Sequence, residues 1–245
     1  MAKAFVDLMD KVTIFDSPKK ATEAIEERLS NSETLTVGFV NAHAFNLAKQ
    51  ERDFYQSLQD LDVVLRDGIG VKIYCKYLGI EPGYNLNGTD YIPYLISAIG
   101  SGKKMAVLGT TLCTIDSAMP ALDATGAETV VKADGFQTVD YYVDLVKNNP
   151  KLDIILLAMG MPKQELVAHA IKPYCNGAVI ICGGAIVDFM GGRVERAPEI
   201  MRMLGLEWCY RLLKEPKRLF KRYVIGNVKF LLTMLNSKKE KYENA

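Results

Sequence analysis

The chain has 245 residues, 49% of them hydrophobic and 24% charged, with a net charge of +1. This length is enough for one α/β domain with a full core and a small addition, and the composition excludes a disordered or fibrous protein. No apolar run reaches the roughly 18 residues of a membrane-spanning helix, and the first residues are too polar to predict a signal peptide.

The small net charge hides an uneven distribution. Residues 196–245 carry twelve Lys and Arg against five Asp and Glu, which gives +7, so the first 195 residues carry −6. A basic segment joined to a mildly acidic body is typical of proteins that meet an anionic surface.

Short apolar runs alternate with amphipathic segments along most of the chain. Strands are predicted over residues 34–40, 61–65, 104–108, 128–131, 152–158 and 178–182. Helices are predicted from residue 18, with Ser17 as cap, and over residues 42–58, 69–78, 89–99 (capped by Thr89-Asp90), 112–122, 139–147 and 162–171. The pattern predicts an α/β fold with a doubly wound, mostly parallel (Rossmann-like) sheet of about six strands, covered by helices on both faces.

The C-terminal part has a different character, and Arg193–Tyr223 contains the only Trp, Trp208. Lys214, Arg218 and Arg222 recur every four residues and share a helical face. Pro216 predicts a break between two helices, over residues 204–214 and 216–235. Basic and apolar residues with a Trp suit a helix in a membrane interface; the alternative is a solvated charged face on a core helix. The polar end, residues 236–245, is predicted to fray.

Glycine follows four of the six predicted strands, next to a helix start. In an open parallel sheet, ligands bind beyond the carboxyl ends of the strands. Free backbone N–H groups at helix starts suit a diphosphate; the alternative at each position is a glycine that merely permits a tight turn. The strand-end residues are Asn41, Asp67-Gly68, Gly109-Thr110, Asp134-Gly135, Gly160 to Gln164, and Gly183-Gly184.

Asp67 is the carboxylate that the pattern singles out, because it follows an apolar strand directly and precedes Gly68. A carboxylate at the mouth of the cleft can accept a proton from a substrate hydroxyl. The alternative is that Asp67 caps the helix that begins at Ile69.

The turn GMPKQE, residues 160–165, is a second unusual feature. Pro162 opens a helix, and Gln164 and Glu165 lie in its first turn beside the expected site. Ordinary helix-start chemistry explains Glu165 near the positive helix end, but it explains Gln164 less well.

Several signals of other chemistry are absent or misplaced. Asp60-Leu61-Asp62 fits the DxD pattern of metal-dependent sugar transferases, but it precedes its strand and so lies at the wrong end of the sheet. His43 and His169 lack metal-ligand spacing, and we interpret both as ordinary helix residues. Five cysteines without a C-x-x-C pair predict buried thiols in a reducing compartment. No G-x-G-x-x-G, P-loop or G-x-S-x-G motif is present, so the sequence predicts no metal and no cofactor.

The segments RDGIGV, NGTD and GMPKQE, followed by GGAIVDFMGGRVERAPEIMRMLGLEWCYRLLKEPKRLFKRY, resemble the WecG/TagA/CpsF glycosyltransferases of bacteria. The resemblance covers residues 34–223. It implies an inverting, metal-independent transfer of a sugar from a UDP-sugar to a polyprenyl-diphosphate-linked saccharide, in polysaccharide or glycoconjugate assembly. It places the protein peripherally on the cytoplasmic face of the bacterial inner membrane.

The resemblance also implies roles for particular residues. Asp67 is the expected general base, and Asn41 and Gln164 join it in the catalytic set. Arg211, Arg218 and Arg222 are expected to meet the lipid diphosphate or the donor phosphates. The expected substrate-binding residues are Gly68, Gly88, Thr89, Asp90, Gly109, Gly135, Phe136, Gly160, Lys163, Glu165, Gly183, Gly184 and Asp188.

Two departures from the family pattern leave the donor sugar open. Members commonly have Thr-Pro-Asn where this chain has Phe39-Val40-Asn41, and Arg or Lys where it has Asn85. Both positions are expected near the sugar and phosphates, and known relatives use N-acetylmannosamine, its uronic acid or glucose.

We therefore expect an α/β nucleotide-sugar-binding catalytic domain in residues 1–195 and a basic amphipathic helical membrane-docking appendage in residues 196–245. The expected partners are a UDP-sugar, the lipid-linked acceptor and an anionic membrane, with no nucleic acid; a homo-oligomer is compatible with the sequence. The alternatives are a soluble nucleotide-sugar epimerase or dehydrogenase, and a non-catalytic membrane-docked binding module.

Overall fold

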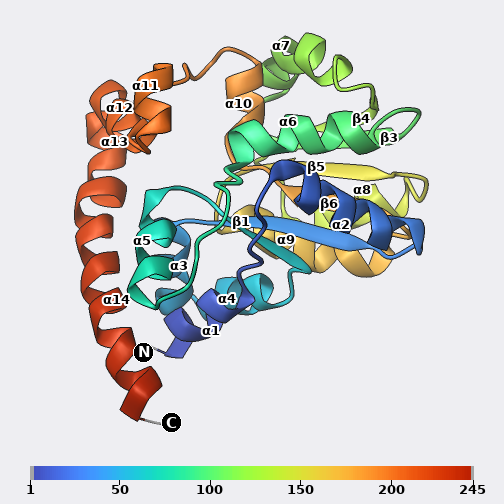
Figure 1. Ribbon diagram of the computed structural model, residues 1–245. Helices are drawn as coiled ribbons and strands as arrows, with labels where there is room; N and C mark the ends of the chain where they lie inside the picture. The colour runs from blue at the N-terminus through green and yellow to red at the C-terminus, as the bar shows by residue number, and fades with distance from the viewer. Residues whose placement is uncertain (1–2, 244–245) are drawn as a thin grey trace.

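A single sheet of six parallel strands organises the molecule, and the computed structural model in Figure 1 describes residues 3–243. The strands are β1 (Leu35–Val40), β2 (Val63–Arg66), β3 (Lys104–Gly109), β4 (Glu128–Ala133), β5 (Ile154–Ala158) and β6 (Val179–Cys182). Their order is β2-β1-β6-β5-β3-β4, and every pair is parallel. The predicted doubly wound α/β fold is confirmed.

Helices cover both faces of the sheet (Figure 1). One layer holds α1 (Lys3–Lys11), α3 (Ala42–Gln50), α4 (Arg52–Gln59), α5 (Ile69–Tyr77), α8 (Val139–Lys147) and α9 (Lys163–Ile171). The other holds α2 (Pro18–Ser30), α6 (Gly88–Ile99), α7 (Leu112–Asp123) and α10 (Ile186–Met190). Successive residues of β5 belong to opposite layers, with Ile155 in the first core and Ile154 and Leu156 in the second. A strand buried on both faces needs apolar residues throughout, which is why β5 is a continuous apolar run, whereas the edge strand β4 carries Glu128 and Lys132.

The structure differs from the sequence prediction at three places. The helix expected over residues 42–58 is two helices, because Glu51 is extended (φ −120°, ψ 105°) and carries no Gly or Pro signal for the break. The helix α1 was not expected, although Phe5, Leu8 and Met9 bury one face of it. The side chain of Asn87 caps α6 by accepting from the Asp90 N–H, so Thr89-Asp90 is not the cap.

The C-terminal segment forms α11 (Glu199–Met203), α12 (Glu207–Lys214), α13 (Pro216–Phe220), a π-helical turn (Lys221–Ile225) and α14 (Gly226–Glu243). The predicted break before Pro216 is confirmed, because Glu215 leaves the helical region (φ −132°, ψ 59°). The residues expected to fray, from 236 onward, are helical up to Glu243, where α14 ends, and the fraying itself stays a prediction; residues 244–245 lie outside the described part. Within the described residues, none of the helices has the length and apolar character needed to cross a membrane.

The helix α14 packs into the core of the α/β body, along α1 and α3 (Figure 1). Phe230 is 1% exposed, and its ring lies 5.7 Å from that of Phe5 and 5.6 Å from that of Phe45. The Tyr74 and Ser237 hydroxyls share a buried hydrogen bond of 2.8 Å. The last part of the expected appendage therefore shares a core with the first 195 residues.

A buried pair, Gln164 and Glu165, joins the turns after β5 and β6. The Gln164 Oε1 accepts from the N–H groups of Gly160 (3.2 Å) and Gly184 (2.8 Å), and its Nε2 donates to Glu165 Oε1 at 2.9 Å. The Glu165 side chain is fully buried, which raises its pKa to about 8 despite the hydrogen bond from Gln164. At neutral pH, Glu165 is therefore a neutral acid that orients the bridging amide.

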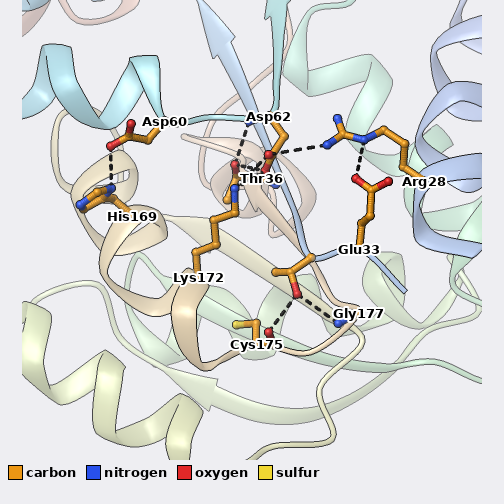
Figure 2. A network of polar contacts seen from close by, with 10 residues as sticks. Arg28, Glu33, Thr36, Asp60, Asp62, His169, Lys172, Cys175 and Gly177 are labelled. Carbon is orange, nitrogen blue, oxygen red and sulfur yellow. Dashed lines mark hydrogen bonds and ion pairs between the residues drawn. The ribbon is translucent and has the colours of Figure 1, made fainter. Parts of the chain in front are cut away.

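A charged network stands at the opposite, amino edge of the sheet (Figure 2). Asp62 accepts from the backbone N–H and hydroxyl of Thr36, both at 2.7 Å, and from Lys172 Nζ at 2.7 Å. Burial alone raises the pKa of Asp62, but the hydrogen bonds from Lys172 and Thr36 outweigh it and hold that pKa below its usual value. The Asp60-Leu61-Asp62 sequence is thus at the amino end of β2, as expected, and Asp62 is committed to joining β1, β2 and α9.

The Asp62→Asn variant tests this network. The free energy of unfolding at neutral pH is expected to fall by about 2–3 kcal/mol, because a carboxylate in charge-assisted bonds is replaced by a weaker acceptor. Since the folded-state pKa is lowered, the contribution is present above the unfolded value near 3.9 and is lost as the pH falls through the lower folded value. Urea unfolding at neutral and acid pH measures both effects.

The control for this experiment is Asp60→Asn. Asp60 pairs with His169 at 3.0 Å, but the two side chains are 38% and 54% exposed, so a change under about 0.5 kcal/mol is expected. Equal losses in the two variants would contradict a special role for Asp62.

The Glu165→Gln variant tests the neutral acid. An amide keeps the acceptor for Gln164 but cannot ionise. In the folded protein the pKa of Glu165 is about 8, against the usual 4.5. The contribution of wild-type Glu165 to the free energy of unfolding is therefore fully present below pH 4.5, and it is lost as the pH rises through about 8. The free energy of unfolding of the variant, relative to that of the wild type, should therefore increase as the pH rises, by at most about 1.4 kcal/mol per pH unit. Urea unfolding across this range measures the gain; the exposed Glu27→Gln is the control, and a pH-independent difference would refute the idea.

Candidate active site

The carboxyl ends of the strands meet at one edge, and the chain reverses its winding there. The connection after β3 leads to the edge strand β4. The connection after β5 leads in the opposite direction along the sheet, toward its middle, to β6. A crevice outside the carboxyl ends at such a reversal is the usual ligand site of this fold. Gly109 ends β3, and Gly160 lies two residues after the end of β5.

Asp67 lies at this edge, directly after β2, and its backbone N–H donates to the Val40 carbonyl at 2.9 Å. Its carboxylate hydrogen-bonds the Asn41 side chain. The Asn41 Oδ1 already caps α3 by accepting from the His43 and Ala44 N–H groups, so the Asn41 amide nitrogen is the donor to Asp67. The N-cap of α5 is Gly68, without a side-chain cap, so the alternative that Asp67 caps this helix is wrong.

The surroundings of Asp67 make its carboxylate more basic. Burial is the largest influence and raises its pKa; the hydrogen bond from Asn41 lowers it, the charge of Glu207 raises it, and Arg222 and Arg211 lower it. The net direction is upward. A raised pKa suits a group that takes up a proton near neutral pH.

Arg211 and Arg222 come from the C-terminal segment and face the same place. Arg211 lies 5.5 Å above the ring of Phe189, and Arg222 5.4 Å from that of Tyr223. The Nε atoms of both are buried and have no hydrogen-bond partner among the described residues. Burial, Arg211 and Arg218 all lower the pKa of Arg222, against the pull of Tyr223 and Asp67. Two half-buried cations, each with a buried Nε donor that no described residue uses, match an anionic ligand.

Arg218 is placed differently from the other two arginines. Its Nε and NH2 donate to both oxygens of Glu215, at 2.6 and 2.7 Å, and its side chain is 60% exposed. The charge of Arg218 lowers the pKa of Arg222, and the charge of Asp188 raises the pKa of Arg218. The Nε and NH2 donors of Arg218, however, are already bound to the Glu215 carboxylate.

The backbone N–H groups expected to bind a diphosphate are engaged by the protein. Those of Gly160 and Gly184 bind Gln164, and that of Gly68 binds Asn85 Oδ1 at 3.0 Å. Those of Gly135 and Gly183 donate to the carbonyls of Thr110 and Leu157, respectively. The expectation of free N–H groups is wrong at these five positions.

Packing explains two of the glycines. A Cβ on Gly109, which has φ +153°, would collide with the Ala158 carbonyl, and one on Gly135 would lie 2.9 Å from the Thr110 nitrogen. At these two positions the alternative stated above, a glycine that merely permits a tight turn of the chain, explains the residue. Lys163 reinforces this region by donating to the carbonyls of Gly135 (2.8 Å) and Gln137 (2.6 Å), while Phe136 between them is 74% exposed.

Asp188 is held beside Thr110, the residue that follows β3. The Thr110 hydroxyl donates to Asp188 at 2.7 Å, and Arg193 lies 3.5 Å from the same carboxylate. Thr110 itself has a positive φ of 39°, a strained conformation for a β-branched residue.

Asn85, one of the two departures, braces the turn of Asp67. Its Oδ1 accepts from the Gly68 N–H and from Arg66 NH1 at 3.1 Å. The buried Arg66 also donates to the carbonyls of Pro82 and Gly83. The other departure, Phe39, is 4% exposed within β1.

Three residues near Asp67 were not singled out from the sequence for this site: Arg196, Glu207 and His43. Arg196 donates to Asp90 at 2.9 Å and to Glu207 at 3.1 Å, which links α6 to α12. Burial and the charge of Arg222 lower the pKa of His43 to about 4, so its ring is neutral at physiological pH. No spacing rule connects these residues; only the folded tail brings them together.

Of the remaining expected residues, Gly88 and Thr89 begin α6 next to Asp90.

Within the described part of the chain, no three or more His, Cys, Asp and Glu are grouped so as to hold a metal ion.

Comparison with known proteins shows the family of this chain. A model of the family described as "Glycosyl transferase WecG/TagA/CpsF family" matches residues 8–244. A Bacillus subtilis (strain 168) protein named N-acetylglucosaminyldiphosphoundecaprenol N-acetyl-beta-D-mannosaminyltransferase is 29% identical over 215 residues, covering 84% of this chain and 80% of its own length.

A protein of the same name from Bacillus spizizenii (strain ATCC 23059 / NRRL B-14472 / W23) is 27% identical over 179 residues, covering 70% of this chain and 68% of its own. Because the family match extends over nearly the whole chain, this protein belongs to the WecG/TagA/CpsF family of glycosyltransferases.

Proposed function

We propose that the protein transfers an N-acetylmannosaminyl-type sugar, with inversion, from a UDP-sugar to a polyprenyl-diphosphate-linked N-acetylglucosamine. The names of the two Bacillus relatives support the sugar and the acceptor. The observation that carries the proposal is the cluster at Asp67: a carboxylate of raised pKa beside two half-buried arginines whose buried Nε donors have no partner among the described residues.

In this mechanism, the Asp67 carboxylate takes the proton of an acceptor hydroxyl. The hydroxyl oxygen forms a bond to the anomeric carbon of the donor, and the bond from that carbon to the diphosphate oxygen breaks, releasing UDP with the electron pair. Attack opposite the leaving group inverts the anomeric centre. Asn41 holds the carboxylate in place, and Arg211 and Arg222 neutralise the diphosphate through guanidinium–phosphate hydrogen bonds.

Residues 196–245 are proposed to dock on an anionic membrane at the cytoplasmic face, with residues 1–195 binding the nucleotide sugar. The α14 side opposite Phe230 exposes Val228 (54%), Leu232 (58%) and Leu235 (50%), which recur every three to four residues. Further exposed apolar side chains precede them on the same segment: Ile200, Met203, Leu204, Leu213, Phe220 and Val224. The exposed lysines 214, 217, 221 and 229 accompany this apolar surface, a combination suited to a membrane interface.

The Asp67→Asn variant tests the base. The kcat for sugar transfer is expected to fall by about 10²–10⁴-fold, the usual worth of general-base catalysis, while the Kd for UDP stays within about threefold of the wild type. Steady-state assays with a lipid-linked acceptor and calorimetric titration with UDP measure the two. Asp60→Asn, at the other edge of the sheet, is the control, and near-normal turnover of Asp67→Asn would rule Asp67 out as the base.

The Leu232→Ser/Leu235→Ser double variant tests the membrane surface. Removing the tail would strip Phe230 from the core, so point changes on its exposed side are the cleaner test. Partitioning onto anionic vesicles should fall by about 10–100-fold, because each leucine loses part of the free energy of burial in the interface. Sedimentation with vesicles measures this against Leu112→Ser/Val130→Ser, which alters exposed apolar residues of α7 and β4. Unchanged sedimentation of the tail variant would show that this side of α14 does not bind the membrane.

A further inference from the structure

A small cavity of about 200 Å³ opens beside the Asp67 turn, and we call it the tyrosine pocket. Its walls come from the loop before α6, the first turns of α6 and the start of α2. The residues used below are Tyr84, Asn85, Asn87, Asp90, Tyr91 and Tyr94, which all line it. None of the steps proposed above uses its aromatic wall.

Two tyrosine side chains of the pocket are unusually exposed for large aromatic residues. Tyr84 is 53% exposed and Tyr94 47%. The ring of Tyr94 stacks on that of Tyr91, with centroids 6.3 Å apart and 26° between the planes. Tyr91 is buried, and its hydroxyl bonds that of Thr22 at 3.1 Å. The wall therefore has a fixed aromatic base and an accessible ring surface.

The polar side chains of the pocket are held in set orientations. Asn87 Nδ2 donates to Asp90 Oδ2 at 2.9 Å, and Arg196 NH1 donates to Asp90 Oδ1 at 2.9 Å. Each carboxylate oxygen has further acceptor capacity. Carboxylate oxygens beside exposed aromatic rings suit a ligand that has hydroxyl groups at its edge and C–H groups on its faces, as a pyranose has.

The pocket is joined to Asp67 by short links on two sides. On one side, Asn85 Oδ1 accepts the N–H of Gly68, the residue after Asp67, while the buried Arg66 holds the carbonyls of Pro82 and Gly83 in the same loop. On the other side, Arg196 connects Asp90 to Glu207, whose charge acts on Asp67. Two residues of the pocket lining, Asn85 and Asp90, are thus connected to the surroundings of Asp67.

We propose that the tyrosine pocket is a subsite for one pyranose ring of a substrate, resting on the glycosyltransfer proposed above. Its volume decides against a larger occupant, because pockets for drug-sized molecules measure about 300–1,000 Å³. A single sugar ring fits, and a nucleotide does not. The ring is either the one transferred from the donor or the sugar already on the lipid diphosphate, and kinetics distinguishes the two.

The Tyr94→Ala and Tyr84→Ala variants test the subsite, with Tyr94→Phe to retain the ring. The KM for one of the two sugar substrates is expected to rise about 5–10-fold in the alanine variants, the worth of one aromatic contact. In Tyr94→Phe it stays near the wild-type value, and the Kd for UDP is unchanged in all. A rise for the UDP-sugar assigns the ring to the donor; a rise for the lipid-linked saccharide assigns it to the acceptor.

The matched control is Tyr174→Ala, since Tyr174 is 42% exposed on a short helix between α9 and β6, at the opposite edge of the sheet. Unchanged KM values for both substrates in Tyr94→Ala and Tyr84→Ala, or a fall in kcat alone, would overturn the subsite while leaving the Asp67 mechanism standing.

Saturation-transfer NMR with methyl glycosides of N-acetylhexosamines gives a readout that does not need turnover. Signal from the sugar ring in the wild type that is lost in Tyr94→Ala supports the subsite. Equal signal in the two proteins would overturn it. If the wild type binds these sugars but transfers none, the proposed reaction fails and the subsite stands.

Discussion

The insertion of Phe230 among Phe5, Phe45 and Tyr74 is the contact on which the C-terminal half of the site depends. It anchors α14 to the layer of helices that covers β1 and β2. The π-helical turn immediately before α14 carries Arg222, so this anchor fixes where that guanidinium lies. The position of a functional cation is therefore set by apolar packing a few residues further along the chain.

With the tail in place, opposite charges gather around Asp67. Asp67 is supplied by the sheet, and Arg211 and Arg222 by the tail. The glycine N–H groups at the strand ends satisfy internal acceptors, which is why the proposed mechanism assigns phosphate binding to these arginines. On that proposal, the α/β body and the tail each supply part of the site.

Much of the sheet was predictable because most of its strands are continuous apolar runs, although the edge strand β4 is partly polar, and Asp67 was predictable because it directly follows β2. The split at Glu51 and the helix at Phe5 were missed, because tertiary packing and not a Gly or Pro determines them. Gln164 was noticed from its motif, but its role as a bridge between two turns depends on Gly184, which is twenty residues away and adjacent only in space. The links from Arg196 to Asp90 and Glu207 have the same long-range origin.

The shared core of α14 and the body has a consequence for reach. On the proposed docking, a membrane that holds the outer side of α14 also holds the carboxyl edge of the sheet in one orientation, because α14 and the body share a core. Asp67, the proposed base, then lies at a fixed height above the membrane. The proposed mechanism requires the acceptor hydroxyl to lie at that height, so the length of the saccharide between lipid and hydroxyl becomes a criterion for choosing substrates, independent of which sugars compose it.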